Sequence, residues 1–128
     1  ANVLKKDSYI KVFAETEMKY YDFSGNEITY KSLFPNNNVY ASQSNGKWGL
    51  VDNSGRVVVP YEYDMVTEQN GNVAGVKKDG IWQVVDTNGQ IVSDRQYNLS
   101  WFDVTFLGSY YKINNSTNGT VYSGTMQN

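Results

Sequence analysis

The sequence predicts an all-β fold made of tandem hairpin units, about four in number, that share one continuous core. Three observations lead to this class. A stretch of the chain recurs at a fixed offset, short apolar runs alternate with turn tetrapeptides, and no segment keeps a 3.6-residue hydrophobic period over ten positions. The 128 residues fit one domain or a short array, and 40% of them are hydrophobic. We expect the units to form an open stack or a barrel-like assembly.

The repeat is clearest in the middle of the chain. Residues 38–66 align without a gap with residues 72–100, at an offset of 34, and nine of the 29 pairs are identical. One of these pairs is a tryptophan, Trp48 with Trp82, and composition alone does not account for such a match. The identical residues of the first copy are Asn38, Val39, Gly46, Trp48, Val51, Asp52, Gly55, Val58 and Tyr63.

Two degenerate copies flank this pair, as expected where terminal units cap an array. Residues 18–29 keep the Asp-x-x-Gly spacing with Asp22 and Gly25, whereas residues 110–122 have Asn114 in place of the aspartate. We therefore predict a single β-repeat domain over residues 1–128, with units at about 9–36, 37–70, 71–102 and 103–125. We expect it to be a piece of a longer protein.

Each unit is predicted to contain about three short strands. Asn45-Gly46 and Asp79-Gly80 suit two-residue hairpins, because both central positions take a positive φ. "DNSG" and "DTNG" follow the next strand and indicate type I turns, with glycine supplying the left-handed residue. A third strand closes each unit, and Pro60 is expected to end the one it follows.

The core is predicted from the alternation of side chains along the second strand. Trp48 and Leu50 should point to one side of the sheet and Gly49 to the other. A strand of this length cannot bury its own apolar face. Stacking the units would let Trp82 and Val84 continue the layer that Trp48 begins, so one shared interior should join the copies.

The stretch "KWGLVDNSGRVVVPYEYD" resembles the bacterial WG repeat, a family of tandem β-hairpin units often carried by exported or surface proteins. The second copy departs from the pattern at Gln83, where glycine is usual, and at Asp94, where proline is usual. The resemblance implies no catalytic activity. It marks a structural signature at Trp48, Gly49, Asp52, Gly55, Pro60, Tyr63, Trp82, Asp86, Gly89 and Tyr97, together with Lys47 and Asp64.

Composition argues against several classes of function. The chain has no histidine and no cysteine, so it lacks the usual imidazole base, the commonest zinc ligand and any thiol chemistry. The net charge is −2 and the basic residues are scattered, which is unlike a nucleic-acid binder. No apolar run approaches the length of a membrane span. We expect no cofactor and no bound metal, and we leave the oligomeric state open.

Two motifs have both a structural and a chemical interpretation. "DNSG" and "DTNG" resemble the start of a calcium loop, but the further oxygen ligands do not follow at the required distance, so we interpret them as turns. Paired carboxylates could hydrolyse a glycosidic bond. Glu62 and Asp64 are the more open candidates for such a pair, whereas Asp52 and Asp86 recur as turn residues.

Aromatic residues outside the repeat positions are the main functional lead. They can cover the core and keep their hydroxyls in water, or they can form a flat surface for sugar rings or a partner protein. The candidates for such a surface are Tyr40, Tyr61, Trp101, Tyr110 and Tyr111.

These observations favour a non-enzymatic module that binds a protein or a cell-wall glycan at the bacterial cell surface. A purely structural spacer or assembly domain of a larger protein is the alternative, and a carboxylate-based hydrolase is less favoured. Exposed aromatic residues on one face would support the first hypothesis. A uniform surface of Asn, Ser and Lys would support the second.

Overall fold

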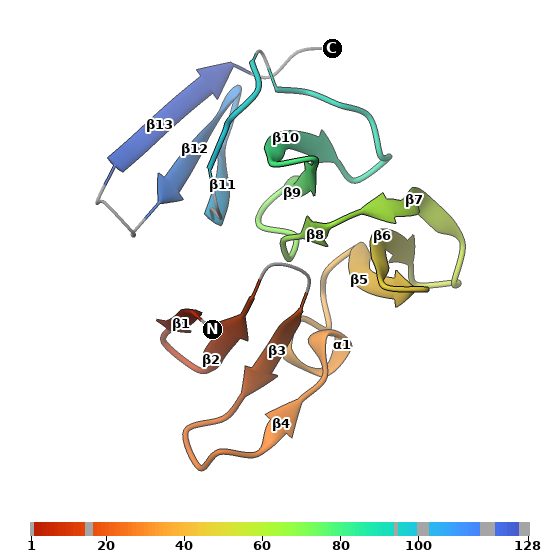
Figure 1. The fold of residues 1–128 in the computed structure, drawn as a ribbon, viewed down its shortest axis with the longest axis vertical. Helices are drawn as coiled ribbons and strands as arrows, with labels where there is room; N and C mark the ends of the chain where they lie inside the picture. The colour runs from red at the N-terminus through yellow and green to blue at the C-terminus, as the bar shows by residue number, and fades with distance from the viewer. Residues whose placement is uncertain (1, 15–16, 94, 100–102, 116–119, 126–128) are drawn as a thin grey trace.

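The computed structural model describes residues 2–14, 17–93, 95–99, 103–115 and 120–125. Within these ranges the chain forms four small antiparallel sheets that follow one another along the sequence (Figure 1). The predicted all-β class with tandem hairpin units is confirmed. Each of the four sheets remains open, and the described residues form no closed barrel.

The first sheet has four strands and is followed by a single helical turn. Its strands, in the order β1-β2-β3-β4, are β1 (Asn2–Lys5), β2 (Ile10–Phe13), β3 (Met18–Tyr21) and β4 (Glu27–Ile28). Helix α1 (Tyr30–Leu33) begins at Thr29, whose side chain accepts a hydrogen bond from the backbone N–H of Ser32. No helix was predicted here, because four residues are too few to show a helical period. No helix in the described ranges has the length and apolar character needed to cross a membrane.

The other three sheets are three-stranded meanders. The second contains β5 (Val39–Ser44), β6 (Lys47–Asp52) and β7 (Val57–Tyr63). The third contains β8 (Met65–Val66), β9 (Val73–Lys78) and β10 (Ile81–Asp86). The fourth contains β11 (Asp103–Leu107), β12 (Tyr110–Asn115) and β13 (Thr120–Thr125).

The predicted turns are present in both central repeats. Asn45 and Gly46 have φ angles of 52° and 80°, and Asp79 and Gly80 have 53° and 82°, as a two-residue hairpin with both residues left-handed requires. In the Asp-x-x-Gly turns, the N–H of Gly55 donates to the carbonyl of Asp52 at 3.0 Å and that of Gly89 to Asp86 at 3.1 Å. The sequence signal therefore fixes the local geometry at these sites.

The prediction that Pro60 ends its strand is wrong, because β7 continues through Pro60 to Tyr63. The pairing of β6 with β7 jumps from Leu50–Val59 to Trp48–Tyr63, so the residues between Val59 and Tyr63 have no partner in β6. A proline in this irregular segment removes no ladder hydrogen bond, which is where a strand tolerates it.

The third segment of the second repeat pairs at the same positions as β7 of the first repeat, but less extensively. This segment is not a strand but makes two isolated bridges, Val85–Ile91 and Trp82–Tyr97. These are the repeat equivalents of Val51–Val57 and Trp48–Tyr63 in the first repeat. The predicted third strand of this unit is thus reduced to single bridges. Asp94, the departure from the family pattern in this segment, lies outside the described residues.

The predicted shared interior is present. Trp48 and Trp82 have exposed fractions of 8% and 0% and belong to one buried cluster, which draws side chains from all four sheets. Aromatic rings extend this cluster between the first sheet, α1 and the second sheet. Tyr9, Tyr20, Tyr30, Phe34 and Tyr40 meet edge to face, with ring centroids 5.3–6.0 Å apart. Much of the aromatic content is therefore structural.

A buried polar segment between β8 and β9 ties the sheets together. Glu68 accepts hydrogen bonds from Lys11 Nζ and from the Tyr20 hydroxyl, each at 3.0 Å. The side-chain oxygen of Gln69 accepts hydrogen bonds from the backbone N–H groups of Asn38 and Val39 at 2.7 and 3.1 Å. The first and second sheets are thus both hydrogen-bonded to one loop of the third.

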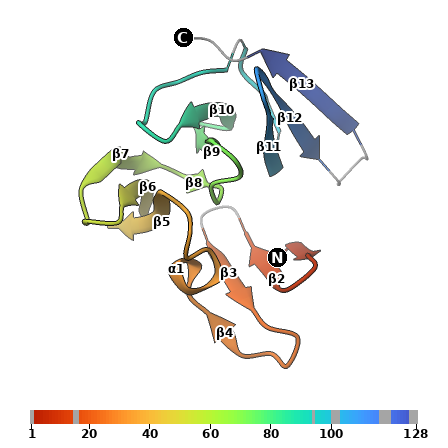
Figure 2. The ribbon, with the colours of Figure 1, turned by 180° about the vertical axis from the view of Figure 1, so that it is seen from behind.

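The four sheets form a circuit in which the last returns to the first (Figures 1 and 2). One residue, Asp64, separates β7 of the second sheet from β8 of the third. At the other end, Lys6 Nζ lies 2.7 Å from an Asp103 carboxylate oxygen and bridges the first and fourth sheets. The shared core therefore lies inside a ring-like arrangement of sheets.

The structure explains why a glycine, Gly49, follows the repeat tryptophan. A Cβ atom at this position would overlap the backbone carbonyl of Val59 and touch that of Pro60. We predict that Gly49→Ala destabilises the fold by about 1–3 kcal/mol, because the backbone of β7 would have to move. Urea unfolding of the two proteins measures the loss.

The control for this change is Gln83→Ala, at the equivalent position of the next repeat, where a side chain is already present. We expect it to cost less than about 1 kcal/mol. Equal losses for the two variants would contradict a specific role for the close approach between β6 and β7.

Candidate binding surface

The structure does not assemble the proposed aromatic surface. Tyr40 and Tyr111 have exposed fractions of 4% and 0%, so both are core residues, and their assignment to a binding surface was wrong. Tyr111 packs against Tyr97, with the two hydroxyl oxygens 2.8 Å apart. Tyr110 precedes it on the same strand and is 47% exposed, as the alternation of side chains requires.

Of the remaining aromatic candidates, the structure describes Tyr61, which lies in a different sheet from Tyr110. Tyr61 is half-buried on β7 in the second sheet, and its hydroxyl lies 3.0 Å from Ser42 Oγ. Tyr110 is on β12 in the fourth sheet. Trp101 lies outside the described residues. The described candidates therefore give one exposed tyrosine, Tyr110, and no shared aromatic surface.

The carboxylates of the repeat aspartates, Asp52 and Asp86, accept hydrogen bonds from the turns that they begin. Asp52 accepts hydrogen bonds from the Ser54 hydroxyl at 2.7 Å and from the backbone N–H groups of Ser54 and Arg56 at 3.0 and 2.9 Å. These bonds, that of the Ser54 hydroxyl first, lower the pKa of Asp52 to about 2. Asp86 accepts from the N–H groups of Asn88 and Gln90 at 2.9 and 3.0 Å. Both carboxylates hold the turn that follows them.

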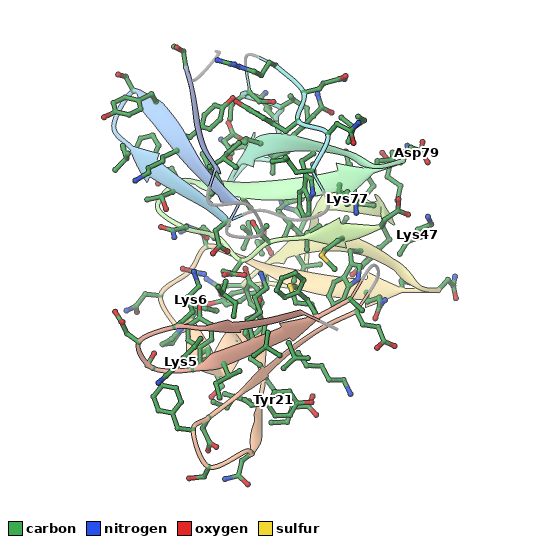
Figure 3. All side chains as sticks on the ribbon, turned by 60° about the vertical axis from the view of Figure 1, so that its left-hand side comes forward. Lys5, Lys6, Tyr21, Lys47, Lys77 and Asp79 are labelled. Carbon is green, nitrogen blue, oxygen red and sulfur yellow. The ribbon has the colours of Figure 1, made fainter. Side chains whose placement is uncertain are left out.

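The alternative pair of acids, Glu62 and Asp64, lies beside lysines, with Glu62 3.9 Å from Lys78 Nζ at an exposed position. Asp64 accepts from Lys47 Nζ at 2.6 Å and from the backbone N–H of Asp79 at 3.1 Å. The hydrogen bond from Lys47, with these other contacts, lowers the pKa of Asp64. Figure 3 shows Lys47, Lys77 and Asp79 gathered at the ends of the hairpins β5–β6 and β9–β10. Asp64 therefore links two successive hairpins.

Three open grooves lie in a row along one edge of the molecule, which we call the turn edge. This edge consists of turns 52–55 and 86–89 and of the hairpin tip 108–109. The first groove, of about 550 Å³, lies between α1 and turn 52–55. The second, of about 450 Å³, lies between the two turns. The third, of about 500 Å³, lies between turn 86–89 and the hairpin tip.

The second and third grooves are lined by equivalent positions of the repeat. Asn38, Asn53 and Ser54 line the second groove, and their counterparts 34 residues later, Asn72, Thr87 and Asn88, line the third. Thr87 and Asn88 also form the far wall of the second groove, so the two grooves adjoin. The structure thus places two grooves of similar size and chemistry one repeat apart.

The grooves are suited to hydrogen bonding with an uncharged ligand. Their polar side chains are mainly amides and hydroxyls. The guanidinium of Arg56 in the second groove is paired with Asp52 at 3.1 Å. The carboxylate of Asp86 in the third groove accepts hydrogen bonds from backbone N–H groups of its own turn. Phe106, partly buried, adds an aromatic ring to the third groove. Volumes of a few hundred Å³ are in the range of ligand sites, although these grooves are open and polar rather than enclosed.

Sequence reasoning missed this surface because it assigned the turn tetrapeptides to turn formation alone. That assignment is correct for Asp52 and Asp86, but it left the two middle residues of each turn unexamined. The available signal was the recurrence of polar side chains at those middle positions, Asn53 and Ser54 in one repeat and Thr87 and Asn88 in the next.

Comparison with known proteins agrees with the repeat geometry. Residues 48–82 match the family model described as "WG containing repeat". The chain carries a WG repeat. The matched segment extends from Trp48 to Trp82. It covers β6 from its second residue, all of β7, β8 and β9, and the first two residues of β10.

The WG repeat explains the signature residues as parts of one structural unit. Lys47 and Asp64 join neighbouring hairpins, Trp48 fills the shared core, and Gly49 lets β7 approach β6. Asp52 and Gly55 form the turn, and Trp48 pairs with Tyr63 across the irregular segment that contains Pro60. Gly89 lies against the backbone of Val58, so the turn of one repeat packs on the strand of the previous one.

Two further comparisons, with curated proteins and with solved structures, add no functional information. No curated protein matches the chain. Among solved structures, "The crystal structure of BamB from Moraxella catarrhalis" is similar with 13% sequence identity and a TM-score of 0.39, over 97% of this chain and 43% of that chain. The WG-repeat chain thus spans less than half the length of that protein.

Proposed function

We propose that this chain is a non-enzymatic WG-repeat module that binds a partner along its turn edge. The observation that supports this most is the pair of grooves one repeat apart, lined by equivalent polar residues. Signature residues such as Trp48 and Asp52 are engaged in the core and turns, whereas the middle residues Asn53 and Asn88 are exposed to solvent. The module thus combines a fixed scaffold with an accessible polar edge.

The hydrogen bonds that keep Asp52 and Asp64 ionised support a non-catalytic role. Hydrolysis by paired acids needs one carboxyl group that keeps its proton near neutral pH. Asp52 and Asp64 instead have lowered pKa values, caused mainly by hydrogen bonds from Ser54 and Lys47 respectively. The sequence also contains no histidine to serve as a general base.

A structural spacer is the second candidate function. It is favoured by the number of repeat residues that serve the fold, and by a turn edge rich in Asn, Ser and Thr rather than in aromatic side chains. On this alternative the grooves are empty solvated surface, and changing their side chains alters no interaction.

The proposed place of action is the bacterial cell surface, where the partner is a protein or a cell-wall glycan. The resemblance to WG repeats of exported proteins supports this location. Fractionation of cells expressing the full gene product, with immunodetection of this domain, tests it. Recovery in the cytosolic fraction alone would contradict the location without affecting the binding proposal.

The binding proposal is tested by comparing variants on one array of neutral polysaccharides and isolated cell-wall sacculi. We predict that the double variant Asn53→Ala/Asn88→Ala loses about tenfold or more in affinity, because each lost hydrogen bond contributes about 1 kcal/mol. Ser24→Ala is the matched control, since it lies in the equivalent turn of the first sheet and lines none of the three grooves. A folded chain that binds no ligand would favour the spacer. A double variant that binds as well as the unchanged chain would contradict the turn edge as the binding site.

A further inference from the structure

The arrangement of the second and third grooves indicates which class of ligand the turn edge can bind. We infer that the ligand is a linear glycan of uncharged sugar units that lies across the second and third grooves at once. This inference rests on the proposed function and adds the ligand class and its binding register. Two adjoining grooves with equivalent linings match a polymer whose own units repeat, because each groove then makes the same contacts with a successive part of the polymer.

The side chains of the two grooves favour sugar hydroxyls as their partners. Asn53 and Ser54 in the first turn, with Thr87 and Asn88 in the second, offer both donors and acceptors. Phe106 adds an aromatic ring on which the C–H face of a sugar could pack in the third groove. The pairing of Arg56 with Asp52 leaves the second groove without a strong preference for an anion.

The backbone of the turn edge does not suit the addition of an extended peptide. A peptide that adds to a sheet needs main-chain N–H and C=O groups that are not already paired. The N–H groups of Ser54 and Arg56 donate to the side-chain carboxylate of Asp52, and the N–H of Gly55 donates to its backbone carbonyl. Recognition at this turn therefore relies on side chains, which can hydrogen-bond the hydroxyl groups of a glycan.

The relative position of the two grooves is fixed by packing. A Cβ on Gly89 would overlap the carbonyl oxygen of Val58, so turn 86–89 lies directly on the strand that forms one wall of the second groove. Asp52 and Asp86 hold the shapes of their turns through backbone hydrogen bonds. Because the grooves are held at one spacing, a polymer long enough to reach both gains from the second contact without new ordering of the protein.

The test is the dependence of affinity on glycan length. Neutral oligosaccharides of one series, from two to eight units, such as cello-oligosaccharides or fully N-acetylated chito-oligosaccharides, are titrated by calorimetry into the intact chain. We expect the affinity to rise by about tenfold or more between the shortest and longest members and then to level off, as two linked contacts predict.

Variants assign this rise to the two grooves. Asn53→Ala alters the second groove and Asn72→Ala the third, and each should flatten the dependence on length, whereas Ser24→Ala should leave it unchanged. Circular dichroism shows whether each variant is folded. Binding that does not depend on length would overturn the two-groove inference and leave the proposed function standing. Capture of a protein partner at the turn edge without any glycan binding would also overturn it, and no binding of any kind would overturn both proposals.

Discussion

Replacing Trp82 by alanine is expected to destabilise the fold by about 3–5 kcal/mol. The side chain has an exposed fraction of 0%, and it lies in the cluster to which all four sheets contribute. Its backbone also exchanges two hydrogen bonds with Tyr97, of 2.7 and 3.0 Å. Removing the indole would leave a cavity where the repeats join. Chemical unfolding followed by tyrosine and tryptophan fluorescence and by circular dichroism measures the loss.

Two related variants serve as references for this prediction. Trp48→Ala should also cost about 3–5 kcal/mol, at the lower end, because 8% of that side chain remains exposed. Phe23→Ala should cost less than about 1 kcal/mol, since that ring is 56% exposed. If Trp82→Ala were no more destabilising than Phe23→Ala, the shared core would not be what stabilises the array.

Breaking the buried ion pair between Lys11 and Glu68 is expected to cost a similar amount, about 3–5 kcal/mol. The two groups are 3.0 Å apart, and their side chains have exposed fractions of only 5% and 8%. Either Lys11→Met or Glu68→Met would leave its partner buried without the opposite charge. The double variant Lys11→Met/Glu68→Met should be closer to the unchanged protein than either single variant, because no buried charge then remains unpaired. A double-mutant cycle of unfolding free energies measures the coupling.

The same pair predicts a loss of stability in acid. Burial opposes ionisation of Glu68, but the charge and hydrogen bond of Lys11 outweigh it, so the pKa of Glu68 in the fold lies below its ordinary value of 4.5. A carboxyl group whose pKa is lowered by folding stabilises the protein above the unfolded pKa. That contribution is lost as the pH falls through the folded pKa.

The unfolding free energy should therefore decrease as the pH falls below about 4.5, and it should decrease less in the double variant. Asp52, whose pKa is lowered to about 2, adds to the slope in both proteins, so the difference between them isolates the contribution of Glu68. Identical pH profiles for the two proteins would show that Lys11 and Glu68 do not favour the ionised form.

Several features of the fold could be predicted because they depend on neighbouring residues. Asn45-Gly46 and Asp79-Gly80 form the expected hairpins, since only their own φ angles and the adjoining strands decide the turn. The buried positions of Trp48 and Trp82 follow from their recurrence at the same place in each unit. In both cases the signal lies within one repeat and does not require knowledge of how the repeats pack.

Other features depend on contacts between distant segments. Tyr40 is buried because Tyr30 of α1 packs against it, and the sequence predicted neither that helix nor that contact. Pro60 could remain within β7 because the register against β6 shifts there. The grooves of the turn edge exist only because successive turns stack, as Gly89 does on Val58. A pattern read within one unit carries no information on these pairings.

The bridge from Lys6 to Asp103 limits how this protein can fold and how it can change in length. These residues are 97 positions apart, so the first sheet cannot complete its packing until nearly all of the described chain has been synthesised. A solenoid that grows in one direction can gain or lose units, because each unit depends only on its neighbours. Here, inserting a further repeat between the second and third sheets would move Asp103 away from Lys6. The number of units is thus tied to a contact between segments from both halves of the chain.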